Sequence, residues 1–102
     1  DGRAHCWDAS TGEKKWSEKI GRSGVMASPL AVGDLIYATL KGGTTVIFKA
    51  SGKGFEKVAE NQLGTDTYAT PVALDKQLFL RVGQSERGNR QEFLYCLEVK
   101  AK

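Results

Sequence analysis

Apolar residues occur along this chain in short runs, separated by Gly, Asp, Ser and Lys. The spacing of three and four residues that is typical of amphipathic helices is poorly represented, whereas short runs bounded by turn residues are typical of β-strands. Most of the twelve glycines lie between the runs, where they supply the positive φ that hairpin turns need. The pattern predicts essentially no α-helix and nine strands, at residues 4–7, 16–20, 26–32, 35–40, 45–50, 55–59, 68–74, 77–82 and 93–99.

The sequence also contains an internal repeat. Residues 27–32 (ASPLAV) align with residues 69–74 (ATPVAL), with three identical and three conservative positions, at an offset of 42 residues. The same offset carries residues 36–38 (IYA) onto residues 78–80 (LFL) without a gap. The two halves of the repeat are therefore expected to form the same set of strands.

A second repeated element occurs three times, as CWD at residues 6–8, IFK at 47–49 and CLE at 96–98. The spacings are 41 and 49 residues, and we expect the extra residues to form one polar loop at 83–92. A period of about 42 residues with four short strands per unit is typical of the blades of a β-propeller.

The nine strands predict an all-β chain. With four antiparallel strands to a blade, they correspond to a β-propeller fragment of about two and a quarter blades. Residues 1–21 form the end of one blade, residues 22–64 a complete blade, and residues 65–102 a blade that lacks its outer strand. Because closed propellers need at least four blades, we expect a single partial domain. Its partners are then the remaining blades of a longer protein or other copies of the chain, and possibly other proteins.

The segment CWDASTGEKKW at residues 6–16 is the sharpest motif. Through Asp8, Gly12 and Trp16 it resembles the tryptophan-docking motif of pyrroloquinoline-quinone (PQQ)-like repeats, which are found in quinoprotein alcohol dehydrogenases and their non-enzymatic relatives. The Ser-Pro and Thr-Pro steps at Pro29 and Pro71 are similar to the first residues of such repeats. The resemblance suggests a periplasmic or extracytoplasmic location.

The three motif residues have distinct physical roles. Asp8 ends a strand, and its carboxylate is expected to accept N–H groups from the following turn. Gly12 supplies the left-handed conformation that this turn requires. Trp16 is expected to pack its ring against the neighbouring blade while its N–H finds a carbonyl, as the equivalent Trp does in the family. The cysteines, Cys6 and Cys96, lie two blades apart, so we expect two free, mostly buried thiols.

The enzymes that this chain resembles hold PQQ with calcium, a catalytic Asp and a disulfide between adjacent cysteines. The chain has no adjacent cysteines, and its isolated aspartates include Asp34 and Asp75 at predicted turns. His5 and Cys6 are neighbours on a strand and point to opposite faces, which excludes a Cys–His nucleophile there. Arg81, at the end of an inner strand, faces either the propeller channel or a neighbouring blade and solvent. The sequence therefore predicts no catalytic, cofactor-binding or metal-binding residue.

Charge and hydropathy argue against two further function classes, nucleic-acid binding and membrane spanning. The net charge of +3 is spread along strands among apolar residues, which is typical of a solvated face and not of a nucleic-acid site. The sequence contains no run of 18 apolar residues, so it predicts no membrane-spanning helix. We expect a non-catalytic scaffold or protein-interaction surface. The alternative is a fragment of a PQQ-dependent quinoprotein dehydrogenase whose PQQ and calcium site lies in other blades.

Overall fold

The computed structural model describes residues 2–98, which form three antiparallel sheets. This part of the chain contains no helix, and so none that is long and apolar enough to span a membrane. The all-β prediction is confirmed. The nine strands of this part are β1 (Arg3–Trp7) and β2 (Lys14–Lys19) in the first sheet, β3 (Leu30–Val32), β4 (Leu35–Thr39), β5 (Thr44–Lys49) and β6 (Lys57–Gln62) in the middle sheet, and β7 (Val72–Leu74), β8 (Gln77–Glu86) and β9 (Asn89–Glu98) in the third sheet.

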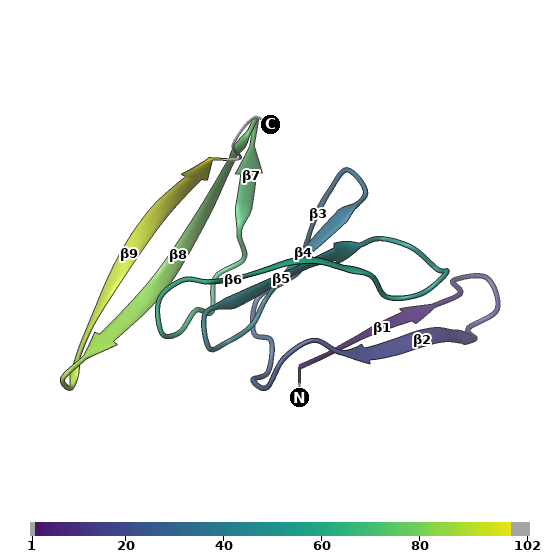
Figure 1. Cartoon of the computed structure of the whole chain (residues 1–102), viewed down its shortest axis with the longest axis horizontal. Helices are drawn as coiled ribbons and strands as arrows, with labels where there is room; N and C mark the ends of the chain where they lie inside the picture. The colour runs from purple at the N-terminus through teal and green to yellow at the C-terminus, as the bar shows by residue number, and fades with distance from the viewer. Residues whose placement is uncertain (1, 99–102) are drawn as a thin grey trace.

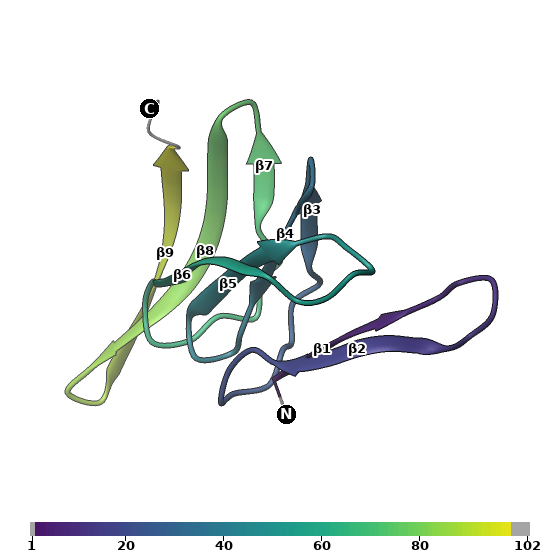
Figure 2. The same ribbon diagram turned by 45° about the vertical axis from the view of Figure 1, so that its right-hand side comes forward.

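Within each sheet the strands pair in chain order, so every connection is a hairpin. Figures 1 and 2 show the three sheets as successive units along the chain, with the first sheet at one end and the third at the other. The β3–β4 and β7–β8 hairpins turn at Asp34 and Asp75, as the sequence predicts. Asp75 has φ 54°, a left-handed conformation that Asp tolerates better than most residues.

Two kinds of strand boundary differ from the prediction. The edge strands β3 and β7 begin only after Pro29 and Pro71, because proline has no N–H to donate to a ladder. The strand predicted at residues 55–59 lies instead at Lys57–Gln62. Phe55 precedes it and packs its ring 5.1 Å from that of Phe48.

The prediction of a polar loop at residues 83–92 is wrong, because these residues extend the β8–β9 hairpin. Pairing continues to Glu86 and Asn89, and the strands are joined by Arg87 and Gly88, with φ 51° and 81°. Two positive φ values in a two-residue loop identify a type I′ turn. The hydrophobic pattern did not predict this part of the hairpin. Residues 83–92 are exposed on both faces, apart from Gly83, so they show no alternation of apolar and polar residues. This part of the hairpin projects from the third sheet in Figure 1.

The first and third sheets pack on opposite faces of the middle sheet. Its buried Ala38, Val46 and Phe48 form the main core with Ile20 and Leu40, against the first sheet. On the opposite face, Tyr37 and Ile47 lie beside residues of the third sheet. The hydroxyls of Thr39 and Thr45 are buried there and bond to each other at 3.1 Å, so this polar pair is satisfied.

The sequence repeat also appears in the tertiary contacts. The N–H of Lys41 donates to the carbonyl of Gly24 at 2.8 Å, and the N–H of Gly83 donates to the carbonyl of Asp66 at 2.8 Å. These two bonds join positions that differ by the repeat offset of 42 residues. The segments that lead into β3 and β7 are therefore held in the same way.

Candidate functional site

The turn after β1 is organised by the Asp8 carboxylate. It accepts the Ser10 N–H at 2.8 Å, the Ser10 hydroxyl at 2.6 Å and the Thr11 N–H at 3.2 Å. These bonds, those from Ser10 first, hold the pKa of Asp8 below its ordinary value. Gly12 follows with φ 78° and donates its N–H to the Asp8 carbonyl. The turn thus has the geometry expected from its sequence, and it delivers the chain into β2.

Trp16 on β2 joins the first sheet to the middle sheet. Its ring meets Phe48 edge-on at 6.3 Å between centroids and Phe55 at 5.7 Å. Its Nε1–H donates to the Ser51 carbonyl at 2.9 Å. The side chain is half-buried, so it combines apolar packing with a satisfied polar atom. This contact positions one wall of a groove between the two sheets.

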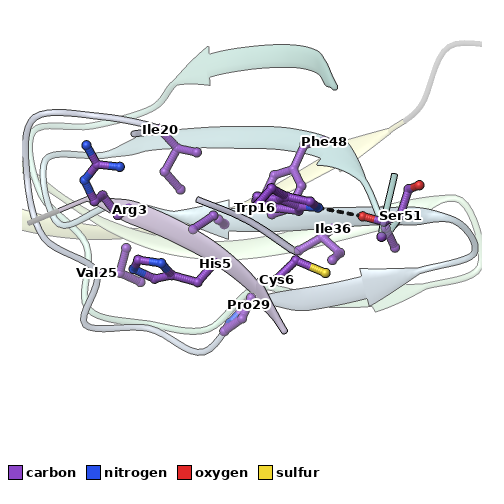
Figure 3. Close-up of a pocket in the computed structure, with 14 residues that line it drawn as sticks. Arg3, His5, Cys6, Trp16, Ile20, Val25, Pro29, Ile36, Phe48 and Ser51 are labelled. Carbon is purple, nitrogen blue, oxygen red and sulfur yellow. Dashed lines mark hydrogen bonds between the residues drawn. The ribbon is translucent and has the colours of Figure 1, made fainter. Parts of the chain in front are cut away.

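The larger groove of the molecule has a volume of about 590 Å³ and lies between the first and middle sheets. Figure 3 shows Val25 beside His5, Pro29 below Cys6, and the side chains of Trp16 and Phe48 above Cys6. Ile36 and Ala38 complete the wall on the middle sheet. Most of this lining is apolar, which is the character of a surface that receives apolar side chains.

A second groove, of about 410 Å³, separates the middle and third sheets. Tyr37 and Ile47 of the middle sheet line one side, and Leu78, Leu80 and Leu97 of the third sheet line the other. Leu78 and Leu80 occupy the places in their sheet that Ile36 and Ala38 occupy in the middle sheet, one repeat earlier. The two grooves are thus formed by equivalent faces.

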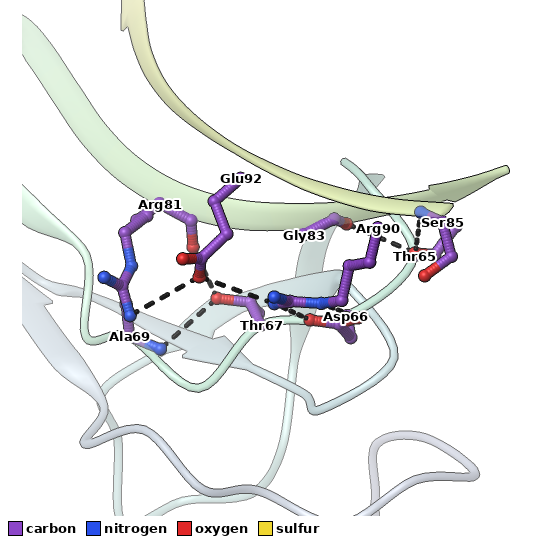
Figure 4. A network of polar contacts seen from close by, with 9 residues as sticks. All are labelled: Thr65, Asp66, Thr67, Ala69, Arg81, Gly83, Ser85, Arg90 and Glu92. Atoms are coloured by element: carbon purple, nitrogen blue, oxygen red, sulfur yellow. Dashed lines mark hydrogen bonds and ion pairs between the residues drawn. The ribbon is translucent and has the colours of Figure 1, made fainter. Parts of the chain in front are cut away.

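Charged side chains of β8, β9 and the loop before β7 lie close together. The Arg90 guanidinium makes two bonds to the Asp66 carboxylate, at 3.0 and 2.6 Å, and reaches Glu92 at 3.5 Å (Figure 4). The bond from Arg90 holds the pKa of Asp66 below its ordinary value, and Asp66 in turn raises that of Arg90. Arg81 is mostly exposed and lies 3.7 Å from Glu92. This network fastens the loop before β7 to β9.

The sequence did not reveal the pairing of Asp66 with Arg90. The two residues are 24 positions apart, and each looks like an ordinary surface charge. Only the extension of the β8–β9 hairpin through residues 83–92, the segment predicted to be a loop, brings them together. Thr65 and Thr67 support the same loop by donating their hydroxyls to the Gly83 and Arg81 carbonyls.

Both cysteines are free, as predicted, but their burial differs from the prediction. Cys6 is half-buried in the larger groove, whereas Cys96 is exposed. The two occupy the same place in the repeat, on the face that is turned to the following sheet. For Cys6 the following sheet is the middle one; within residues 2–98 no sheet follows the third, so Cys96 remains uncovered.

The two prolines also occupy equivalent places with different surroundings. Pro71 is fully buried, whereas Pro29 is exposed at the rim of the larger groove. Ser28, just before Pro29, donates its N–H to the Thr70 hydroxyl at 3.0 Å. The start of the middle sheet therefore lies against the start of the third.

The acidic groups of the described residues do not match a calcium–quinone centre. Calcium takes six or more oxygen ligands, whereas no three His, Cys, Asp or Glu side chains of residues 2–98 come together in a metal-binding group. The Asp66 carboxylate is bonded to Arg90, and the Asp8 carboxylate to its own turn. We therefore derive no step through calcium or PQQ.

No protein-family model matches this chain, and no curated protein is significantly similar to it.

Proposed function

We propose that this chain is a non-catalytic PQQ-like β-propeller repeat, whose sheets are successive blades that act as a scaffold and a protein-interaction surface. The single observation that supports it best is the hydrogen bond between Ser28 and Thr70. It joins two residues one repeat apart, just before β3 in the middle sheet and just before β7 in the third. Propeller blades come closest at their inner strands and diverge outward.

The interaction role rests on the character of the surfaces. Both grooves are lined mainly by apolar side chains, and the outer face of the third sheet exposes Val72, Leu74 and Leu94, the last 71% exposed. Exposed apolar surface of this extent is typical of places where another protein packs. The charged cluster of Asp66, Arg81, Arg90 and Glu92, by contrast, is paired internally and holds the loop before β7 to the third sheet.

Spin-label distance measurements test the radial arrangement. Val32, Leu35 and Lys49 form one row across the middle sheet, and Leu74, Gln77 and Glu98 form the equivalent row across the third. With both cysteines replaced by serine, labels at Val32 and Leu74 report the inner separation, and labels at Lys49 and Glu98 report the outer one. We expect the outer distance to be the longer; equal distances would show a flat stack and overturn the blade assignment.

A titration of the chain with PQQ and calcium tests whether it binds the cofactor that catalysis would need. The scaffold proposal expects no saturable change in the visible spectrum of the quinone when this chain is added. Saturable binding that depends on calcium would instead favour the dehydrogenase alternative. The same titration with a known quinoprotein, stripped of cofactor, is the positive control.

A further inference from the structure

We propose that the projecting arm of the β8–β9 hairpin, residues 83–92, is a conformational clamp that sets the width of the second groove by fixing the angle between the middle and third sheets. This inference rests on the proposed function, because it concerns the regulation of a groove that we treat as an interaction surface. The clamp closes on the linker between the two sheets, residues 63–71. Release of its ion pair widens the groove without unfolding either sheet.

The third sheet is joined to the rest of the molecule through this linker. The main core lies between the first and middle sheets, and among residues 2–98 its members include none from the third sheet. On the middle sheet, the linker is bonded to the β4–β5 turn. The Leu63 N–H donates to the Gly43 carbonyl at 3.0 Å, and the Thr67 N–H donates to the Lys41 carbonyl at 2.9 Å.

The linker also lies directly on β8. Val82 is 1% exposed, and a Cβ placed on Gly64 would lie 2.8 Å from the Val82 Cγ2 and 2.7 Å from the Gly83 carbonyl oxygen. Gly64 has φ 71°, so glycine suits both the conformation and the close approach. The buried apolar surface of β8 is therefore in contact with the linker itself.

The arm holds the linker from the third sheet. The Thr65 N–H donates to the Gly83 carbonyl, and the Gly83 N–H donates to the Asp66 carbonyl, both at 2.8 Å. The Ser85 N–H donates to the Thr65 hydroxyl at 2.9 Å. Arg90 adds its two bonds to the Asp66 carboxylate (Figure 4). The linker is thus bonded to both sheets, and its position determines how they lie relative to each other.

The repeat shows which of these contacts is special to this joint. One repeat earlier, the bond between Gly83 and Asp66 has its equivalent in the bond between Lys41 and Gly24. Glycine has no carboxylate to offer at the place of Asp66, and the β4–β5 hairpin is too short to have a residue at the place of Arg90. The ion pair is therefore an addition, made by the same insertion that lengthens the β8–β9 hairpin.

The ion pair is suited to orienting two parts of a molecule. Two bonds between a guanidinium and a carboxylate fix the relative orientation of both groups. Arg81 and Glu92 extend the pair into a network, the arrangement in which a surface ion pair contributes most. Because the Asp66 and Arg90 side chains are 23% and 41% exposed, salt screens their attraction. The clamp is therefore tight at low ionic strength and loosens as salt rises.

The clamp acts on the groove because the linker borders it. Leu63, the first residue of the linker, lines the second groove together with Asn61 of β6 and Glu98 of β9. A change of angle at the linker therefore changes the separation of the two walls. The segments before β3 and β7 stay joined by the bond between Ser28 and Thr70, so we expect a rotation about that end.

Spin labels at Asn61 and Glu98, across the groove, test the clamp in the full chain with both cysteines replaced by serine. Asp66→Asn removes the charge and keeps the size of the side chain. We expect a longer mean distance and an about twofold broader distance distribution. Asp75→Asn removes a carboxylate from the exposed β7–β8 turn and is the matched control, expected to leave the distances unchanged. Circular dichroism establishes that both variants fold.

A shortened hairpin tests the arm without a change to the linker. Gln84 and Gln91 are directly paired, so replacing residues 85–90 with Asn-Gly leaves a two-residue turn between them and removes Arg90. This variant should widen the groove at least as much as Asp66→Asn does. Adding Asp66→Asn to the shortened hairpin should change nothing more, since both changes remove the same contact.

Salt tests the clamp even if a variant fails to fold. Raising NaCl from about 20 mM to about 500 mM should lengthen the distance between Asn61 and Glu98 in the parent chain. The same change of salt should have no effect in Asp66→Asn. Labels at Lys19 and Glu60, on the first and middle sheets, should report no change under any of these treatments, because the main core holds that joint.

Three results would overturn the inference: unchanged distances across the groove in Asp66→Asn, a salt response that this variant retains, or equal widening between Lys19 and Glu60. The blade arrangement is tested by other label pairs in the chain with an intact clamp. Those pairs can give the expected distances while Asp66→Asn leaves the groove unchanged, which would refute the clamp alone. Equal inner and outer distances would refute the blades and leave the clamp standing.

Discussion

Trp16 and Trp7 show how the same residue type takes different roles nine positions apart on neighbouring strands. Trp16 points to the middle sheet and meets two phenylalanine rings. Trp7 points to the other face of the first sheet and is 55% exposed, with the Lys14 ammonium 5.0 Å from its ring centre. Strand alternation decides between the two roles, because it sets which face each residue presents.

We expect Trp16→Ala to cost about 2–4 kcal/mol in the free energy of unfolding, because it removes half-buried aromatic packing and the bond to Ser51. Trp7→Ala should cost no more than about 0.5 kcal/mol, as for an exposed side chain. Urea unfolding followed by circular dichroism measures both. Equal midpoints for the two variants would contradict the docking role of Trp16.

The pair Asp66–Arg90 predicts a pH dependence of stability. The folded pKa of Asp66 is depressed below its ordinary value of 3.8, so the ion pair stabilises the fold above that pH and is lost as pH falls through the folded pKa. Unfolding midpoints measured between pH 6 and pH 2 should fall in acid, and less steeply in Asp66→Asn. Asp75→Asn, at an exposed turn, is the control; an identical slope for Asp66→Asn and wild type would argue against the pair.

Hairpins are the repeating element of this chain, and their turns are set by local chemistry. The β8–β9 turn places Arg87 and Gly88 at positive φ, and type I′ turns favour Asn-Gly at these positions. Arg is therefore an unfavourable residue at its own position. The long hairpin forms nevertheless, because ten residues of each strand pair along its length.

Arg87→Asn should raise the melting temperature, with a gain of about 0.5–1 kcal/mol in the free energy of unfolding, since Asn tolerates the left-handed conformation. Gly88→Val should lower the stability by a larger amount, because a β-branched residue is strained at φ 81°. Differential scanning calorimetry compares both with the wild type. A loss of stability in Arg87→Asn would show that the turn is not of type I′.

At the scale of the whole molecule, the middle sheet has the first sheet on one face and the third on the other, whereas within residues 2–98 the first and third sheets each have a neighbouring sheet on one face only. Equivalent residues therefore have different exposures, according to what lies next to them. Cys6 faces the middle sheet and is half-buried, whereas Cys96 is exposed on the outer face of the third. The position in the stack, not the residue type, decides the environment.

Alkylation of the native chain should consequently label Cys96 first, about tenfold faster than Cys6, because Cys96 is exposed and Cys6 is half-buried. Mass spectrometry after digestion assigns each label. In denaturant without reductant, both cysteines should react completely. A native chain that labels the two at the same rate would contradict the packing of the first sheet on the middle sheet.

The sequence by itself determined the all-β class, the strand order and the turns at Asp8, Asp34 and Asp75. These features depend on local rules: apolar runs bounded by turn residues, and side chains that bond to their own backbone. The sequence also placed Trp16 beside a neighbouring sheet through its position after the Asp8 turn. All of this information lies within a few residues of the positions concerned.

Only the tertiary structure decided the length of the β8–β9 hairpin, the pair between Asp66 and Arg90, and the exposure of Cys96 and Pro29. A polar strand pair that is exposed on both faces leaves no periodic signal, and partners 24 residues apart meet only once the hairpin forms. Burial likewise depends on what packs against a face. Pro29 and Pro71 have nearly the same local sequence, yet only Pro71 is buried, since burial is set by neighbouring segments such as the start of the middle sheet, which bonds to Thr70.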